Sequence, residues 1–202
     1  YSWNPATDLS SSTVSDPTAN PADTITYTMT ETFTATGCQN SNSITVTVNS
    51  LPSAITGADQ TICENSGIQI GAVSVAGNTY NWVPSTGLDL ASVSDPFANP
   101  TSTTLYTLTE TVTATGCNRS NSVTVNVNPA PAALVGPNQT ICNGQSVPVG
   151  AAAVGGNTYA WNPATGLDDA TLSDPTANPS NTTVYTLIET ITATGCQHSD
   201  SV

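Results

Sequence analysis

The sequence has no lysine, a single arginine (Arg119) and a single histidine (His198), and only 7% of its 202 residues are charged. Its 14 acidic residues set a formal net charge of −13, which would repel polyphosphates and anionic membrane surfaces. Nucleic acids are therefore excluded as partners. No run of 18 apolar residues is present, so we expect no insertion into a membrane.

Groups that perform catalysis are equally scarce. A serine or cysteine nucleophile would depend on His198 for its base, and the two corresponding positions of the repeat described below hold Asn40 and Arg119. Intramolecular isopeptide bonds require lysine and cannot form. We predict that the chain is not an enzyme, with no catalytic residue and no cofactor.

Strong helix formers are also in short supply, whereas threonine (36 residues), glycine (14) and proline (14) are abundant. Threonine favours β-strands, while glycine and proline favour turns. The composition therefore predicts an all-β chain whose strands are joined by tight turns.

A repeat of 79 residues dominates the sequence, since Trp3, Trp82 and Trp161 are separated by 82−3 and 161−82 residues. The same shift relates two sets of cysteines: Cys38, Cys117 and Cys196, and Cys63 and Cys142. It predicts three domains: a partial one at 1–49 that lacks its first strands, a complete one at 50–128, and one at 129–202 that lacks most of its last strand.

Alternating apolar and polar residues predict the strands of the complete unit. We expect strands at 60–63 and 68–72, joined as a hairpin by the turn 64–67, and further strands at 79–83, 105–115 and 122–127. This spacing is typical of an antiparallel β-sandwich, and the signatures of a β-propeller are missing. The expected core is built around aromatic residues: Trp3, Trp82, Trp161, Tyr27, Tyr106 and Tyr185.

Several short motifs recur at the 79-residue spacing. In the complete unit they are Ile-Cys at 62–63, Tyr-Asn-Trp-Val-Pro-Ser-Thr-Gly-Leu at 80–88, Ser-Asp-Pro-Phe-Ala-Asn-Pro at 94–100 and Thr-Gly-Cys at 115–117. This pattern resembles the PKD-like and immunoglobulin-like repeats of very large secreted surface proteins of gliding Bacteroidota. The resemblance implies tandem immunoglobulin-like sandwiches in a stalk or adhesin, often exported by a type IX system.

The five cysteines predict disulfides rather than metal ligands, because they show no Cys-x-x-Cys spacing. Equal spacing of 54 residues suggests Cys63 with Cys117 and Cys142 with Cys196. In a sandwich, however, those turns lie at opposite ends, too far apart for a bond. The alternative joins Cys63 to Cys196 of the next repeat. Topology slightly favours this inter-domain bond, and we expect Cys142 to be oxidised as well.

Two sets of acidic residues are candidates for special roles. Asp16, Asp95 and Asp174 each precede a proline, which is typical of a capped turn, and calcium binding is the alternative. Glu31, Glu110 and Glu189 fall on the apolar side of a strand. We expect a bulge or overhang that lets them reach water, with a metal or inter-chain contact as the alternative. The other side of that strand carries a row of threonines.

These features predict an extracellular, non-enzymatic array that forms a stalk, an adhesin or a filament at a bacterial surface. Its expected partners are neighbouring repeats or identical chains, and surface glycans are further candidates. The alternative is an array of ligand-binding modules for carbohydrate, calcium or ice. Because the first and last repeats are incomplete, we expect either a window on a longer polypeptide or chains that complete one another by strand exchange. Stacked repeats of constant length predict a rod.

Overall fold

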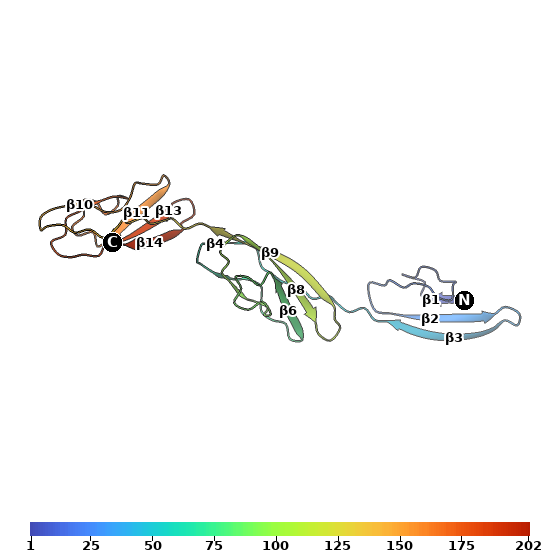
Figure 1. Ribbon diagram of the computed structural model, residues 1–202. Helices are drawn as coiled ribbons and strands as arrows, with labels where there is room; N and C mark the ends of the chain where they lie inside the picture. Colours follow the sequence, from blue (N-terminus) through green and yellow to red (C-terminus); the bar gives the residue numbers. More distant parts are fainter. The chain divides into compact units, whose positions relative to one another are not determined.

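The computed structural model describes all 202 residues and is entirely β, as the composition indicates. It contains no helix, and so none that is long and apolar enough to cross a membrane. Two compact units divide the chain: Tyr1–Ser53 with Glu110–Arg119, and Ala54–Thr109 with Ser120–Val202. Each repeat has its own strands, and Figure 1 labels most of them.

The first repeat holds one sheet with the strand order β1-β2-β3. Its strands are β1 (Ser2–Asn4), β2 (Ile25–Phe33) and β3 (Cys38–Val46). β2 pairs antiparallel with β3 along its whole length, from Ile25 opposite Val46 to Phe33 opposite Cys38. This long hairpin is closed by the turn at Gly37, whose φ of 74° suits glycine.

The second repeat is a sandwich of two sheets. The larger sheet has the order β4-β9-β8-β6, and the smaller one pairs β5 with β7. The larger sheet contains β4 (Gln60–Cys63), β6 (Asn78–Val83), β8 (Thr104–Val112) and β9 (Asn118–Asn128). The smaller sheet contains β5 (Ile68–Gln69) and β7 (Phe97–Ala98). This is an immunoglobulin-like arrangement, in which β4 pairs in parallel with β9.

The third repeat has the same layout without a counterpart of β4, with sheets of order β11-β13-β14 and β10-β12. Its strands are β10 (Val147–Pro148), β11 (Asn157–Asn162), β12 (Thr176–Ala177), β13 (Thr186–Ile191) and β14 (Gln197–Ser201). The isolated bridges between Leu88 and Ala98 and between Leu167 and Ala177 show the same 79-residue shift.

The predicted hairpin of residues 60–63 and 68–72 is wrong. β4 instead pairs in parallel with the end of β9, while β5 pairs antiparallel with β7, so the two segments belong to different sheets. The short turn between the two segments does not reveal that they join different sheets, because the partner of each strand lies far along the chain.

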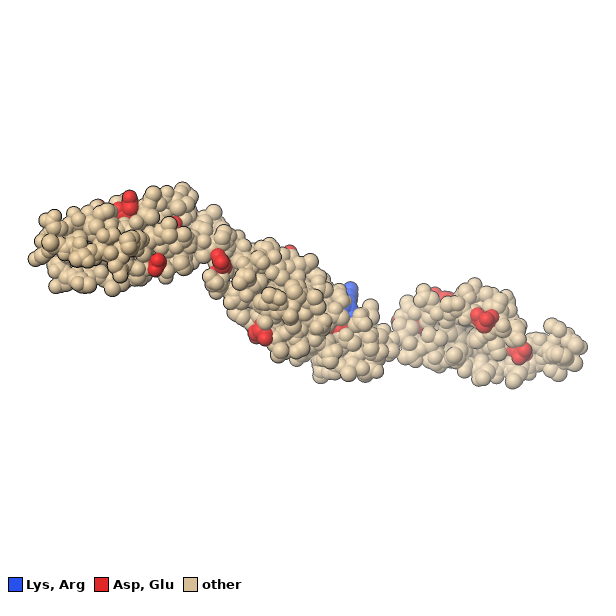
Figure 2. Space-filling view, viewed as in Figure 1, with Lys and Arg blue, Asp and Glu red and all other residues tan.

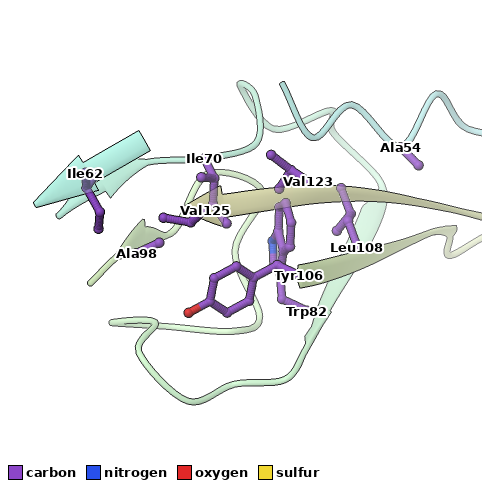
Figure 3. Close-up of a cluster of buried hydrophobic side chains, with 9 residues drawn as sticks. All are labelled: Ala54, Ile62, Ile70, Trp82, Ala98, Tyr106, Leu108, Val123 and Val125. Carbon is purple, nitrogen blue, oxygen red and sulfur yellow. The ribbon is translucent and has the colours of Figure 1, made fainter. Parts of the chain in front are cut away.

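A tryptophan and a tyrosine organise the core of the second repeat, as Figure 3 shows. Trp82 is 1% exposed, and its indole nitrogen donates a hydrogen bond to the carbonyl of Val93 at 3.0 Å. Tyr106 is fully buried, and its hydroxyl donates to the carbonyl of Thr86 at 2.8 Å. Burial raises the pKa of Tyr106. Both polar tips thus pin the irregular loop to the sheet.

The same bonds recur in the other repeats. Trp161 donates to the carbonyl of Leu172 and Tyr185 to that of Thr165, both at 2.9 Å. In the first repeat Tyr27 is 1% exposed, but Trp3 is only half-buried. That repeat has no second sheet to cover the indole, although the Trp3 nitrogen still donates to Val14 at 2.9 Å.

Candidate functional site: the junction of the second and third repeats

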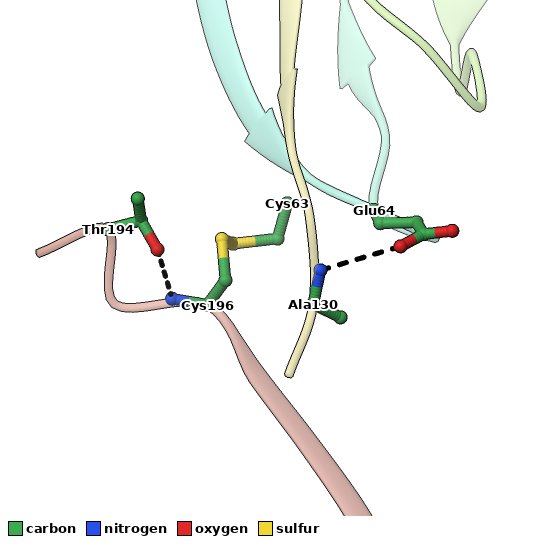
Figure 4. Close-up of a disulfide and its surroundings, with 5 residues drawn as sticks. All are labelled: Cys63, Glu64, Ala130, Thr194 and Cys196. Atoms are coloured by element: carbon green, nitrogen blue, oxygen red, sulfur yellow. Dashed lines mark hydrogen bonds between the residues drawn. A yellow bond between two sulfur atoms is a disulfide. The ribbon is translucent and has the colours of Figure 1, made fainter. Parts of the chain in front are cut away.

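A disulfide bond joins the second repeat to the third. Cys63, at the end of β4, bonds Cys196, at the turn before β14, with 5.5 Å between the two Cα atoms and a sequence separation of 133 residues. Figure 4 shows the bond and its surroundings. The Cys196 backbone N–H donates to Thr194 Oγ1 at 3.3 Å, and Cys196 is fully buried. The inter-domain pairing predicted from topology is the one present.

The pairings suggested by equal spacing are wrong, because Cys63 and Cys196 bond each other rather than Cys117 and Cys142. Cys38, Cys117 and Cys142 carry free thiols in this structure. Cys38 and Cys142 are exposed, and Cys117 is half-buried. Cys142 thus has no disulfide partner within this chain, and its oxidation by a cysteine of a further repeat stays a prediction.

The linker that follows β9 is tied to the second repeat through Glu64. The Glu64 backbone N–H donates to the Asn128 carbonyl at 2.8 Å, while its carboxylate accepts from the Ala130 N–H at 3.4 Å. Pro129 and Pro131 flank Ala130 and restrict its backbone. The linker between the repeats is thus held on the side of the second repeat.

A buried carboxylate holds the other end of the linker. Glu189, on β13, is 4% exposed. Its Oε2 accepts from the Ala133 backbone N–H, and its Oε1 accepts from the Asn157 side-chain amide, both at 2.7 Å. Ala133 is fully buried with a φ of 47°. A negative charge without a basic partner is thus compensated by two short hydrogen bonds.

The bulge or overhang expected to expose Glu189 to water is not found, because the side chain is buried and accepts hydrogen bonds from its own repeat and the linker. A metal or inter-chain contact stays a prediction. The corresponding residues of the second repeat are Ala54, Asn78 and Glu110. Glu110 is 3% exposed, and Ala54 has a φ of 48°, close to that of Ala133. Glu31, the corresponding residue of the first repeat, is exposed.

The single histidine also lies at this junction. His198 is exposed, and its Nδ1 is 3.3 Å from the carbonyl oxygen of Ala132 in the linker. A protonated Nδ1 can donate to that oxygen. The Cys63–Cys196 bond, Glu64, Glu189 and His198 together fasten the linker, and we define these residues with residues 128–133 as the junction.

The aspartates of the irregular loops make local hydrogen bonds. The side chains of Asp95 and Asp174 accept from the hydroxyls of the preceding serines at 3.1 and 3.2 Å, and Asp16 does so at 3.3 Å. No group of three or more His, Cys, Asp or Glu side chains is arranged to hold a metal ion. Figure 2 shows the acidic side chains scattered over the visible face rather than gathered in one patch. Calcium binding stays a prediction.

The loop of the third repeat is held by Asp168, whose Oδ1 accepts from the backbone N–H groups of Asp169 and Thr176, both at 2.8 Å. The Thr176 bond, followed by the Asp169 bond, lowers the pKa of Asp168. As the pH falls below the ordinary aspartate pKa of about 3.9, the Asp168 carboxylate is therefore protonated in the unfolded chain before it is protonated in the folded chain.

We expect the third repeat to lose stability as the pH falls below about 4, and Asp168→Asn to reduce this loss because asparagine does not titrate. Urea unfolding of both proteins at pH 6 and near pH 3 measures the effect. An identical pH dependence in the variant and the parent chain would contradict the role given to Asp168.

The outward threonines are paired across the strands. Thr107 and Thr109 on β8 bond the hydroxyls of Ser122 and Ser120 on β9 at 2.9 and 2.8 Å. The first repeat has three such pairs, and the third has one between Thr186 and Ser201 at 2.9 Å. These hydroxyls satisfy one another, so the row strengthens the sheet by cross-strand bonds.

The third repeat also has a hollow of about 480 Å³, lined by residues 138–143, 147, 149, 177, 179–185 and 202. Residues 139–142 have the same sequence as β4, Gln-Thr-Ile-Cys, but they pair with no strand. In the second repeat, residues 125–128 of β9 pair with β4. We assign this hollow no ligand.

The sequence matches no protein-family model and no curated protein. Solved structures that match include an I-band fragment of titin (12% identity, TM-score 0.34, 73% of this chain and 62% of that one). A mutated three-immunoglobulin variant of titin matches at 10% identity and a TM-score of 0.43, over 98% of this chain and 84% of that one. Sidekick-1 immunoglobulin domains match at 11% identity and a TM-score of 0.34, over 91% of this chain and 59% of that one. The chain thus spans less than two thirds of the first titin fragment. Such low scores carry no functional argument, and the fold assignment rests on the strand topology.

Proposed function

We propose that this chain is part of an extracellular, non-enzymatic tandem array that forms a stalk or filament at a bacterial surface, with a structural or adhesive role. The observation that carries the proposal is the Cys63–Cys196 bond between successive repeats. Structural disulfides persist in oxidising compartments, which supports an extracellular location. The resemblance to surface-protein repeats of gliding Bacteroidota points the same way.

The junction supports a structural role because it limits the freedom of the linker. Covalent attachment at Cys63 adds to the hydrogen bonds that Glu64 and Glu189 accept from the linker. Prolines at 129 and 131 stiffen the same segment. A linker fastened at both ends suits a stalk better than a flexible string of independent binding modules.

The partners that we propose are further repeats of the same kind, in the same polypeptide or in identical chains. The turn at Cys142 repeats the turn at Cys63: the N–H groups of Gln145 and Ser66 donate to the two cysteine carbonyls at 2.9 and 3.0 Å. The turn at Cys117 likewise repeats that at Cys196, with Gly116 and Gly195 each donating to a carbonyl at 2.8 Å. The chain therefore carries a second copy of each turn that forms the Cys63–Cys196 bond, and the cysteines of these copies have free thiols.

Immunogold labelling of intact producing cells, with antibodies raised against this chain, tests the proposal. We expect gold particles along stalks or filaments at the cell surface, and loss of the label after protease treatment of the intact cells. Antibodies against a cytoplasmic protein of the same cells provide the control. Label that appears only after the cells are permeabilised would contradict the proposed location.

A further inference from the structure

We infer a mechanical function for the Cys63–Cys196 bond: when the chain is pulled by its ends, tension crosses the disulfide and bypasses most of the second and third repeats. This inference rests on the proposed function, since a stalk or filament is the setting in which tension arises. It concerns a property of the chain, however, that can be measured without any cell.

The bypass follows from the connectivity of the covalent chain. A pulling force that reaches Cys63 from the N-terminal side has two routes to Cys196: the backbone, with a sequence separation of 133 residues, or the disulfide, whose Cα atoms are 5.5 Å apart. The short route becomes taut first. The backbone between the two cysteines therefore stays slack until the bond is broken.

The bypassed backbone contains nearly all of both cores. In the second repeat, every buried core residue except Ala54 and Ile62 lies after Cys63. In the third repeat, all the buried core residues lie before Cys196. Trp82 and Trp161 are both inside the bridged segment. While the bond is intact, tension therefore cannot extend the segment that carries nearly all the buried core residues of the two repeats.

Two short strands stay outside the bypass. β4 ends at Cys63, and it pairs with residues 125–128 of β9. β14 begins just after Cys196, and it pairs with β13. Tension acts on these two strands directly, but each has few pairing residues, so their detachment would add little length.

The length withheld from extension is large. An extended chain spans roughly 3.3–3.6 Å per residue, so a separation of 133 residues corresponds to about 45 nm. The oxidised chain should therefore extend about 45 nm less than the reduced chain when both are fully stretched. Thiol reduction would convert a short tether into a long one.

Single-molecule force spectroscopy of the full chain, with handles at Tyr1 and Val202, tests this inference. We expect the oxidised chain to reach a final contour length about 45 nm shorter than the same chain in dithiothreitol. The double variant Cys63→Ala with Cys196→Ala should show the long contour under both conditions. Cys142→Ala, which removes a free and exposed thiol, should behave like the parent chain.

Equal contour lengths for the oxidised and the reduced parent chain would overturn the inference. So would non-reducing peptide mapping of the oxidised protein that recovers Cys63 and Cys196 as free thiols. These failures leave the surface labelling of cells untouched. Conversely, a short oxidised contour together with an intracellular label would retain the tension bypass and reject the proposed function.

Discussion

Breaking the Cys63–Cys196 bond is expected to lower the free energy of unfolding of the second and third repeats by about 5 kcal/mol. The bond closes a loop with a sequence separation of 133 residues. Cross-linking a loop of this length lowers the conformational entropy of the unfolded chain, which is equivalent to about 5 kcal/mol of stability at 25 °C. Urea unfolding followed by tryptophan fluorescence measures the loss, because Trp82 and Trp161 are buried in the two repeats.

The comparison should be made between the oxidised protein, the reduced protein and the double alanine variant of Cys63 and Cys196. The reduced protein and the variant should both unfold at lower urea concentration than the oxidised protein. Cys142→Ala is the matched control and should leave the midpoint unchanged, since Cys142 is exposed and unpaired. Coincident transitions for the oxidised and reduced chains would contradict the expected contribution.

Replacing Glu189 with alanine is expected to destabilise the third repeat by about 3–5 kcal/mol. The carboxylate accepts two hydrogen bonds of 2.7 Å, from the Ala133 N–H and the Asn157 amide. Bonds to a charged group contribute roughly 1.5–3 kcal/mol each, and the substitution leaves the buried Ala133 N–H and the half-buried Asn157 amide without this acceptor. Chemical denaturation of the third repeat in the oxidised chain measures the loss.

Two further variants distinguish the loss of the two hydrogen bonds to Glu189 from the general effect of removing a negative charge. Glu189→Gln keeps one oxygen acceptor but turns an N–H₂ group toward the other donor, so it should lie between the parent and the alanine variant. Glu31→Ala alters the corresponding but exposed residue of the first repeat and should change stability by no more than about 0.5 kcal/mol. Equal losses for Glu31→Ala and Glu189→Ala would show that burial of the carboxylate is not the cause.

Strands with a clear apolar alternation could be predicted closely. The segment expected at 79–83 corresponds to β6 at Asn78–Val83, and the one expected at 122–127 lies within β9 at Asn118–Asn128. In β9, Val123 and Val125 are 1% and 0% exposed, as their alternation with Thr124 indicates. Period-2 alternation records which face of a strand is buried, so it locates strands whose two faces differ.

Only part of the junction could be predicted from the sequence. Topology favoured the Cys63–Cys196 bond over the evenly spaced pairs, because turns at opposite ends of a sandwich cannot meet. The alternation pattern also placed Glu189 on the inner face. It could not identify the donors to Glu189, because Ala133 and Asn157 lie 56 and 32 residues away in sequence. No local pattern records a bond between a strand and a distant backbone N–H.

The sequence by itself determined the 79-residue period, the all-β class and the aromatic core, because composition, spacing and alternation are local properties of the chain. Only the tertiary structure decided which segments pair. The neighbouring segments β4 and β5 join different sheets: β4 pairs in parallel with β9, and β5 pairs antiparallel with β7. A strand is completed by hydrogen bonds to a neighbour, and that neighbour is chosen by packing far along the chain.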